Sequence, residues 1–250
     1  NPYVDYSGAA KVFYILVSME ILTVMFLIPS FTAGSIAGER EKQTLDILLT
    51  TTLTPGEIIM GKLMSSISMV FLLVVSSLPI ISIVFTIGGI GMEDMLMFML
   101  EILIISFFIG SMGMLASTVL KKTVQATVCS FAQIVLVCGG TVVVVIVAYI
   151  AAKLYYYNCM GAVGSMPDVS SVLFILLINP AFTIVQMTAR HCESVSVISK
   201  AAGMLNGSMP STIVDNWFKL SMISQMIVTV ILLRMSAIFL KPARKKKTLS

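Results

Sequence analysis

The sequence predicts an all-α membrane protein that crosses the bilayer several times, and three observations lead to this fold class. Of the 250 residues, 58% are hydrophobic and only 11% are charged, whereas an ordinary soluble domain is about 25% charged. The mean hydropathy is +1.01. The apolar runs reach about twenty residues, the length that a helix needs to cross a bilayer and about twice the length of a barrel strand. A soluble enzyme and a disordered chain are therefore excluded.

Five apolar runs are predicted to be membrane-spanning helices of a single transmembrane domain that covers residues 1–250. In chain order they are Val12–Phe31, Ile58–Ile87, Met95–Leu120, Val124–Ala152 and Leu220–Leu240. Each is long enough to cross a hydrocarbon core of about 30 Å. Pro79 lies near the far end of the second run and is expected to kink that helix, because proline lacks the backbone N–H donor.

A sixth apolar run, Val172–Met187, is shorter and is interrupted by Asn179-Pro180. If it does not cross, ten basic residues beside the spans fall on one face, which the positive-inside rule assigns to the cytoplasm. They are Arg40, Lys42, Lys62, Lys121, Lys122, Lys241, Arg244, Lys245, Lys246 and Lys247. We therefore expect the sixth run to be a non-crossing helical segment within an external region, Lys153–Lys219. Asn1 is then external as well, so six spans are expected in the full protein.

The segment between the first two spans is predicted to form a short amphipathic helix, Gly38–Leu49, on the cytoplasmic face. Glu39, Lys42 and Asp46 recur at helical spacing, and Leu45 begins an apolar stripe that Leu48 and Leu49 continue. Such a helix can lie on the membrane surface, where basic residues dominate the polar face. Here the charges have mixed signs, which favours docking of a soluble partner.

This segment resembles the coupling region of type-2 ATP-binding-cassette (ABC) exporter permeases. The shared pattern is Glu-Arg-Glu-x-x-Thr-Leu-x-x-Leu-Leu-Thr-Thr-Pro with a nearby Gly-Lys, and the likeness covers about thirty residues. Thr52 stands where proline is common in that family, and Gln43 where a small or basic residue is frequent. The residues that match the motif and are candidates for coupling to an ATPase are Glu39, Arg40, Glu41, Thr44, Leu45 and Leu48.

The resemblance implies a permease subunit that exports a substrate across the plasma membrane of a bacterial cell. The ATP is hydrolysed by a separate ABC ATPase subunit, and the permease pairs with a second copy or with a paralogue. Glu41 and Arg40 are expected to set the register against the ATPase through charge-assisted contacts, with Leu45 and Leu48 as the apolar anchor. Beyond these partners only membrane lipid is expected, and no nucleic acid.

Two acidic residues inside the predicted spans support an alternative function. Glu20 lies near the middle of the first span and Glu101 in the outer part of the third. A charge at mid-membrane costs on the order of 3 kcal/mol or more, so each is expected to face protein or a cavity. They are candidates for a translocation path, or they form interhelical hydrogen bonds. A self-contained ion-coupled carrier or channel that uses both is the alternative to the permease.

No catalytic, cofactor or metal site is predicted. The run Gly56 to Lys62 nearly spells a phosphate-binding loop, but Leu63 stands where that loop needs a hydroxyl group. We therefore expect no ATPase site, and Gly61 is expected to allow close helix packing. Cys159 and Cys192 fall in the predicted external region, where a disulfide is chemically allowed. The four cysteines lack the spacing of a zinc site.

The third predicted span carries two pairs of small residues at a spacing of four. These pairs are Ser106 with Gly110, and Gly113 with Ser117. Small residues at this spacing let two helices approach closely in a membrane. The partner helix can belong to the same subunit or to a second copy.

Overall fold

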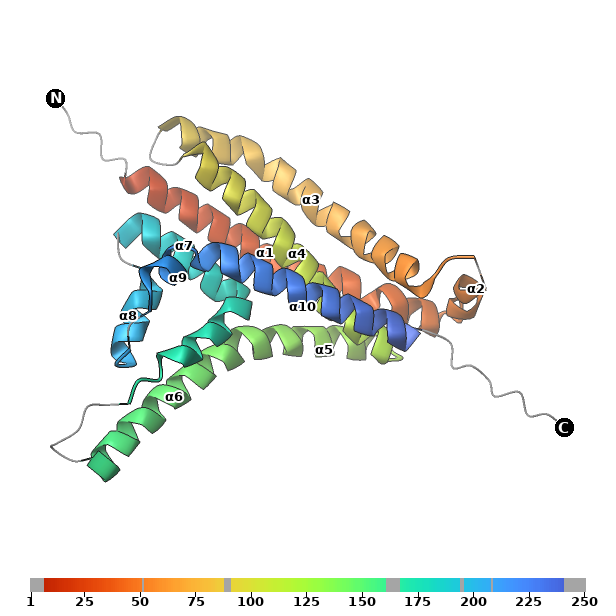
Figure 1. Cartoon of the computed structure of the whole chain (residues 1–250). Helices are drawn as coiled ribbons and strands as arrows, with labels where there is room; N and C mark the ends of the chain where they lie inside the picture. Colours follow the sequence, from red (N-terminus) through yellow and green to blue (C-terminus); the bar gives the residue numbers. More distant parts are fainter. Residues whose placement is uncertain are drawn as a thin grey trace.

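The computed structural model describes residues 7–50, 52–87, 91–160, 167–193, 196–207 and 209–240, and every regular element in them is helical (Figure 1). The side chains of residues 7–11, 14, 84–87, 94, 159–160 and 187–193 are not described. The predicted all-α fold class is confirmed. The α-helices are α1 (Ser7–Glu41), α2 (Leu45–Leu49), α3 (Pro55–Ile87), α4 (Met92–Val119), α5 (Thr123–Val135), α6 (Thr141–Tyr155), α7 (Pro180–Glu193), α8 (Val197–Met204), α9 (Ser211–Asp215) and α10 (Trp217–Leu240). Two π-turns, Leu136–Gly140 and Tyr156–Met160, and a 3₁₀ helix, Ser170–Ile178, complete the described elements.

Five helices in the described part of the chain are long and apolar enough to cross a membrane, as predicted. They are Ile15–Glu41, Pro55–Ile83, Met95–Val119, Thr123–Asn158 and Trp217–Leu240. Three of them are longer than the sequence suggested, and the last of these begins at Trp217 instead of Leu220. The first continues past Phe31 through the charged residues to Glu41, and the fourth continues past Ala152 to Asn158.

The core of the bundle lies around α4, which packs against α1, α3, α5 and α10. Its buried side chains include Phe98, Ile105 and Phe108, which meet Val17 and Ile28 of α1 in one apolar cluster. The rings of Phe13 and Phe98 meet edge to face with centroids 5.0 Å apart. Four helices pack around α4, so their positions in the bundle depend on their contacts with it.

Small residues set the closeness of α4 to its neighbours within this chain. A Cβ atom added at Gly113 would lie inside the contact distance of the Thr32 side chain of α1, and one at Gly110 would meet Leu63 of α3 and Ile28 of α1. The Ser117 hydroxyl accepts hydrogen bonds from the backbone N–H groups of Ile36 and Ala37, both at 2.9 Å. The small-residue pairs of the third span thus serve packing inside one subunit.

The sixth apolar run is divided at Asn179, as its Asn-Pro pair predicted. The 3₁₀ helix ends at Ile178, Asn179 is extended, and α7 begins at Pro180. An extended residue before proline avoids a clash with the proline ring. The Asn179 side chain accepts a hydrogen bond at 3.1 Å from the Phe182 N–H and so caps α7. Neither piece is among the helices long enough to span a membrane.

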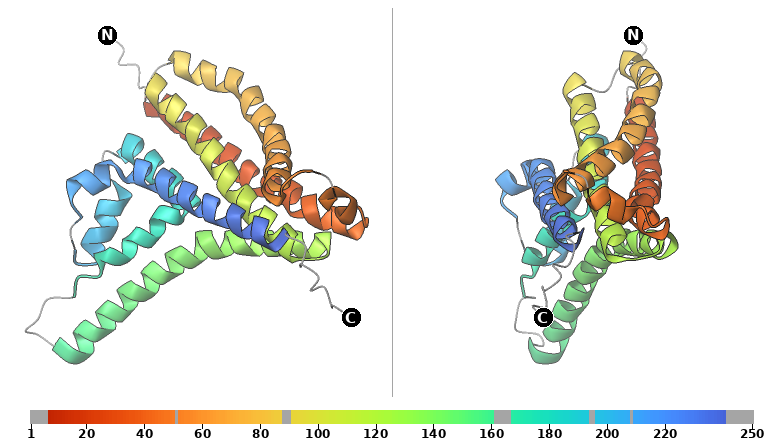
Figure 2. Two further views of the ribbon diagram at one scale, coloured as in Figure 1. Left: turned by 45° about the vertical axis from the view of Figure 1, so that its right-hand side comes forward. Right: turned by 90° about the vertical axis from the view of Figure 1, so that its right-hand side faces the viewer.

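The fourth span diverges from the bundle along its length (Figure 2). Its first part, α5, packs against α1 and α4, whereas only 6% of the most apolar window of the span is buried. The π-turn Leu136–Gly140 joins α5 to α6 and holds two consecutive glycines. Asn179 donates from its side-chain amide to the Cys138 carbonyl at 2.9 Å and to the Thr141 hydroxyl at 2.8 Å. The interrupted sixth run therefore holds the fourth span at its π-turn.

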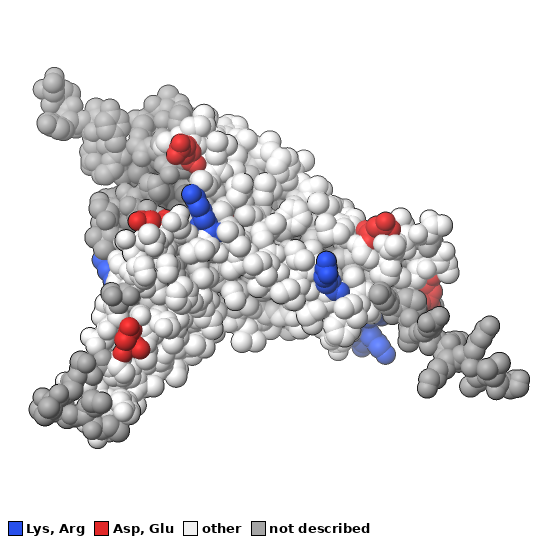
Figure 3. Space-filling view, in the orientation of Figure 1, with Lys and Arg blue, Asp and Glu red and all other residues white. Residues whose placement is uncertain are grey.

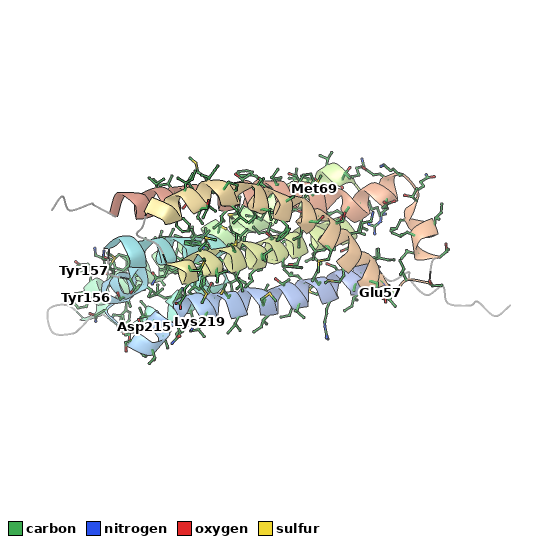
Figure 4. All side chains as sticks on the ribbon, turned by 90° about the horizontal axis from the view of Figure 1, so that it is seen from above. Glu57, Met69, Tyr156, Tyr157, Asp215 and Lys219 are labelled. Atoms are coloured by element: carbon green, nitrogen blue, oxygen red, sulfur yellow. The ribbon has the colours of Figure 1, made fainter. Side chains whose placement is uncertain are left out.

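Charged side chains gather toward the two ends of the molecule and are sparse between them (Figure 3). Glu57 lies at the end that carries α2, whereas Asp215, Lys219, Tyr156 and Tyr157 lie at the opposite end (Figure 4). Tyrosines and charges at the ends of apolar helices are typical of membrane–water interfaces. The helices α7, α8 and α9 also lie at the end away from α2 (Figure 1).

Candidate functional site

The candidate site is the turn that joins α1 to α2. The chain reverses at Gln43, whose φ of 59° is left-handed. The backbone N–H of Lys42 donates to the Gly38 carbonyl at 3.0 Å, and that of Thr44 donates to the Glu39 carbonyl at 2.9 Å. These bonds satisfy carbonyls that a helix end would otherwise leave unpaired. The turn fixes α2 to the end of α1.

The structure divides the segment for which we predicted a single helix. Residues 38–41 form the last turn of α1, and only Leu45–Leu49 form the separate helix α2. The long α1 continues because its last turns consist of small residues that fit against α4 and α5. Ala33 and Ala37 are buried with Ala126 of α5, and the Thr123 methyl lies 3.5 Å from the Cβ position of Gly38. Hydropathy alone places the end of a span where charges begin, and so it missed these turns.

Glu39 connects α1 to the starts of α2 and α3. Its Oε1 atom accepts from the Lys62 ammonium group at 2.7 Å, which is an ion pair between half-buried side chains. Its Oε2 atom accepts a hydrogen bond from the Thr44 hydroxyl. The fold thus brings together two residues of the matched motif, Glu39 and Thr44, and the lysine of the nearby Gly-Lys pair, Lys62.

Arg40 and Glu41 contact the junction between α4 and α5. The Arg40 guanidinium donates to the Leu120 carbonyl at 3.0 Å and to the Thr118 carbonyl at 3.1 Å. The exposed Glu41 carboxylate accepts a hydrogen bond from the Thr123 hydroxyl, at the first residue of α5. We expected these two charges to face a partner protein, and the structure shows both in contacts within the chain.

The apolar residues of α2 divide between an inner and an outer face. Leu45 is buried at 8% exposure against Ile36, Ile58 and Leu63, and Leu48 packs partly on the same cluster. Ile47, in contrast, is 69% exposed. The sequence pattern drew attention to Leu45 and Leu48 and missed Ile47. Leucines three or four apart mark one face of a helix, but the pattern does not say whether that face meets the chain itself or a partner.

The run from Gly56 to Lys62 that nearly matches a phosphate-binding loop forms the first turns of α3. Thr54 and Glu57 form a capping box, in which the Thr54 N–H donates to the Glu57 carboxylate at 2.7 Å and the Glu57 N–H donates to the Thr54 hydroxyl at 3.3 Å. Pro55 takes the first helical position, where its missing N–H costs nothing. Gly61 has no atom within 4 Å of its Cβ position, so our expectation of close packing there is wrong.

The two intramembrane acids differ in their surroundings. Glu20 of α1 accepts a hydrogen bond from the Ser77 hydroxyl of α3 at 2.8 Å. Glu101 of α4 is 1% exposed, and neither of its carboxyl oxygens has a hydrogen-bond partner among the described residues. Glu20 thus forms an interhelical hydrogen bond of the kind we considered, whereas Glu101 does not. Cys159 and Cys192, between which the sequence allows a disulfide, lie outside the described side chains.

Comparison with known protein families matches nearly the whole chain. Residues 4–242 match the family described as ABC-2 family transporter protein. No curated protein matches the sequence significantly. The family match agrees with the resemblance of the segment around Glu39 and with the five apolar helices. The chain therefore belongs to the ABC-2 family of transporter proteins and is a multi-pass membrane permease of an ABC transporter.

Proposed function

We propose that the chain is an exporter permease whose helix α2 docks on a separate ABC ATPase subunit at the cytoplasmic face of a bacterial plasma membrane. ATP-driven closure of the ATPase moves α2 and, with it, the spans on either side. A second copy or a paralogue completes the path across the membrane. The permease then has two conformations, and ATP binding to the ATPase subunit shifts the equilibrium between them.

The exposure of Ile47 is the observation that carries this proposal. Ile47 is 69% exposed on α2, and Leu53, in the link from α2 to α3, is 51% exposed. Asp46 immediately precedes Ile47 in the chain, Lys42 lies five residues before it, and both charged side chains are exposed. An apolar side chain with mixed charges around it matches the usual anatomy of a protein interface, an apolar centre with a polar rim. Leu45 and Leu48 hold α2 on the bundle, so that it presents Ile47 as a rigid element.

The α2 end of the molecule is proposed to be cytoplasmic because the basic residues near it are numerous. Arg40, Lys42, Lys62, Lys121 and Lys122 all flank the ends of spans on this side. Positive residues that flank spans favour the cytoplasmic side. The export direction rests on the likeness of the α1–α2 segment to exporter permeases.

Co-purification with the ATPase tests the proposal. The permease with Ile47→Asp is expected to retain about one tenth or less of the ABC ATPase that the native permease retains, because a side chain buried at the centre of an interface contributes about 1.4 kcal/mol or more to binding. Met204→Asp is the matched control, since Met204 is 70% exposed on α8 at the opposite end. Equal losses in both variants, or a native permease that retains no ATPase, would contradict the proposal.

The burial of Glu101 favours one alternative function, a self-contained ion-coupled carrier. An acidic group without a partner inside a membrane span is a typical candidate for an ion or proton site. A carrier of this kind moves its substrate without nucleotide and has no need of α2. Substrate movement that depends on Glu101 and needs no nucleotide distinguishes the carrier from the permease.

A further inference from the structure

Three consecutive charged residues at the end of α1 contact three different spans. Glu39 forms an ion pair with Lys62 of α3. Arg40 donates to the carbonyls of Thr118 and Leu120 at the end of α4. Glu41 accepts from the Thr123 hydroxyl at the start of α5. We call this set of residues, Glu39-Arg40-Glu41, the charged triplet.

Helix geometry explains how neighbours in sequence reach separate partners. Successive residues of an α-helix point about 100° apart around its axis. α1 packs against α3, α4 and α5, so three successive side chains are enough to touch all three. The three side chains point in different directions because residues 39–41 are helical, so the arrangement depends on the extension of α1 to Glu41.

The signs of the charges match the helix ends that they meet. The end of α4 leaves carbonyl groups unpaired and carries partial negative charge, and the Arg40 guanidinium donates to two of these carbonyls. The start of α5 carries partial positive charge, and Glu41 lies there. Because α4 and α5 are joined only by a short link that includes Lys121 and Lys122, the two contacts hold the same corner of the chain.

The triplet is also attached to α2. Glu39 accepts from the Thr44 hydroxyl through one carboxylate oxygen and from Lys62 through the other. Thr44 immediately precedes α2, and its backbone N–H donates to the Glu39 carbonyl at 2.9 Å. A displacement of α2 therefore acts on Glu39 directly, and from there on α3.

We infer that the charged triplet is a transmission hub, which passes a displacement of α2 to α3, α4 and α5 together. The inference rests on the proposed docking of α2 to an ATPase, and it assigns Glu39 and Arg40 to positioning the spans instead of binding that partner. Glu39 and Arg40 are half-buried in these internal contacts, whereas Ile47 is the exposed apolar side chain. Docking and transmission are thus separate tasks of neighbouring residues.

The test measures binding and movement separately in the complex of permease and ATPase. Spin labels replace Met64 of α3 or Val124 of α5, each paired with a label at Met204 of α8 as the reference, in a cysteine-free background, because all three side chains are exposed. The distance between the labels is recorded in lipid nanodiscs with ATP and without nucleotide. Co-purification of the ATPase is measured on the same variants.

Glu39→Lys places two positive charges together and is expected to abolish the ATP-dependent change in distance while the ATPase still co-purifies to within twofold of the native amount. Adding Lys62→Glu restores the opposite pair and is expected to restore the change. Arg40→Gln is expected to act like Glu39→Lys. Arg234→Gln is the matched control, because the Arg234 side chain is exposed on α10 and has no hydrogen bond or ion pair in the described part of the chain, and it is expected to behave like the native protein.

Two results would overturn the inference. If Glu39→Lys or Arg40→Gln releases the ATPase as Ile47→Asp does, the triplet is a docking site. If the variants bind and move like the native protein, the triplet transmits nothing. Should Glu39→Lys fail to fold, the milder Lys62→Gln is judged by the same two measurements. A native permease that binds no ATPase would refute the proposed function itself, which is a different result.

Discussion

A single buried carboxyl group distinguishes the permease from the ion-coupled carrier. Glu101 sits in α4 between Phe98 and Ile102, which belong to the apolar core, and both of its oxygens lack a partner among the described residues. Burying a polar group without a hydrogen bond costs about 1–3 kcal/mol. Glu101 thus lowers stability, and a function is the usual reason for keeping such a group.

Replacing Glu101 by Met is expected to raise the unfolding temperature of the purified permease, because the unpaired group is removed and the volume is nearly kept. Gln225→Met is the contrasting variant, since the buried Gln225 amide donates to Thr183 and Ser221, and its loss is expected to lower that temperature. If the chain is a permease, Glu101→Met keeps nucleotide-dependent movement in the complex. Substrate movement that needs no nucleotide and is lost in a well-folded Glu101→Met variant would support the carrier instead.

Glycines show how differently one residue type is used in this fold. Gly113→Ala is expected to cost about 1–3 kcal/mol, the usual penalty of overpacking, because the new methyl group would meet the Thr32 side chain. Gly61→Ala is expected to be neutral or stabilising by up to about 1 kcal/mol, because alanine favours a helix and the position is open. Thermal unfolding in one detergent compares the two. Equal effects would contradict the packing described here.

At the scale of elements, Asn179 holds the interrupted sixth run against the fourth span. Asn179→Ala removes the two hydrogen bonds to the π-turn and the cap of α7 together. Each net hydrogen bond is worth about 1 kcal/mol and a cap about the same, so a loss of roughly 2–3 kcal/mol is expected. Hydrogen exchange is expected to rise in α6 and α7 but not in α3. Asn216→Ala, which breaks only a bond within its own turn, serves as the control.

The elements were predictable from sequence to different degrees. The five spans and the break at Asn179 follow from hydropathy and from proline chemistry, which act locally. The length of α1 and the two faces of α2 do not, because they depend on contacts far apart in sequence. Ser117 of α4 holds the backbone of Ile36, and Leu45 fits a pocket formed largely by α3. Charges at 39–41 drew attention to a segment whose side chains contact three spans, but these partners could not be read from their spacing.

At the scale of the whole molecule, the two ends are expected to lie on opposite sides of the membrane. A membrane-impermeant thiol reagent added to intact cells is expected to modify Met204→Cys and not Ile47→Cys in a cysteine-free background, and both after the cells are lysed and the ATPase is dissociated. Both positions are well exposed in the permease chain, so without the ATPase access depends on the membrane. Modification of Ile47→Cys from outside would reverse the orientation and refute the proposed docking to a cytoplasmic ATPase.

The π-turn at Leu136–Gly140 has a consequence for insertions and deletions in the fourth span. A π-turn closes its hydrogen bonds over five residues, so the span holds one residue more than a regular helix at this point. Deleting one residue there would leave a regular helix and would keep the face that α6 presents. A deletion at the start of α6 would instead turn the residues beyond it by about 100°, so that Val145 and Tyr149, which now pack against the cluster around Trp217, would face elsewhere. Sequence length is therefore expected to vary more readily at this turn than within α6.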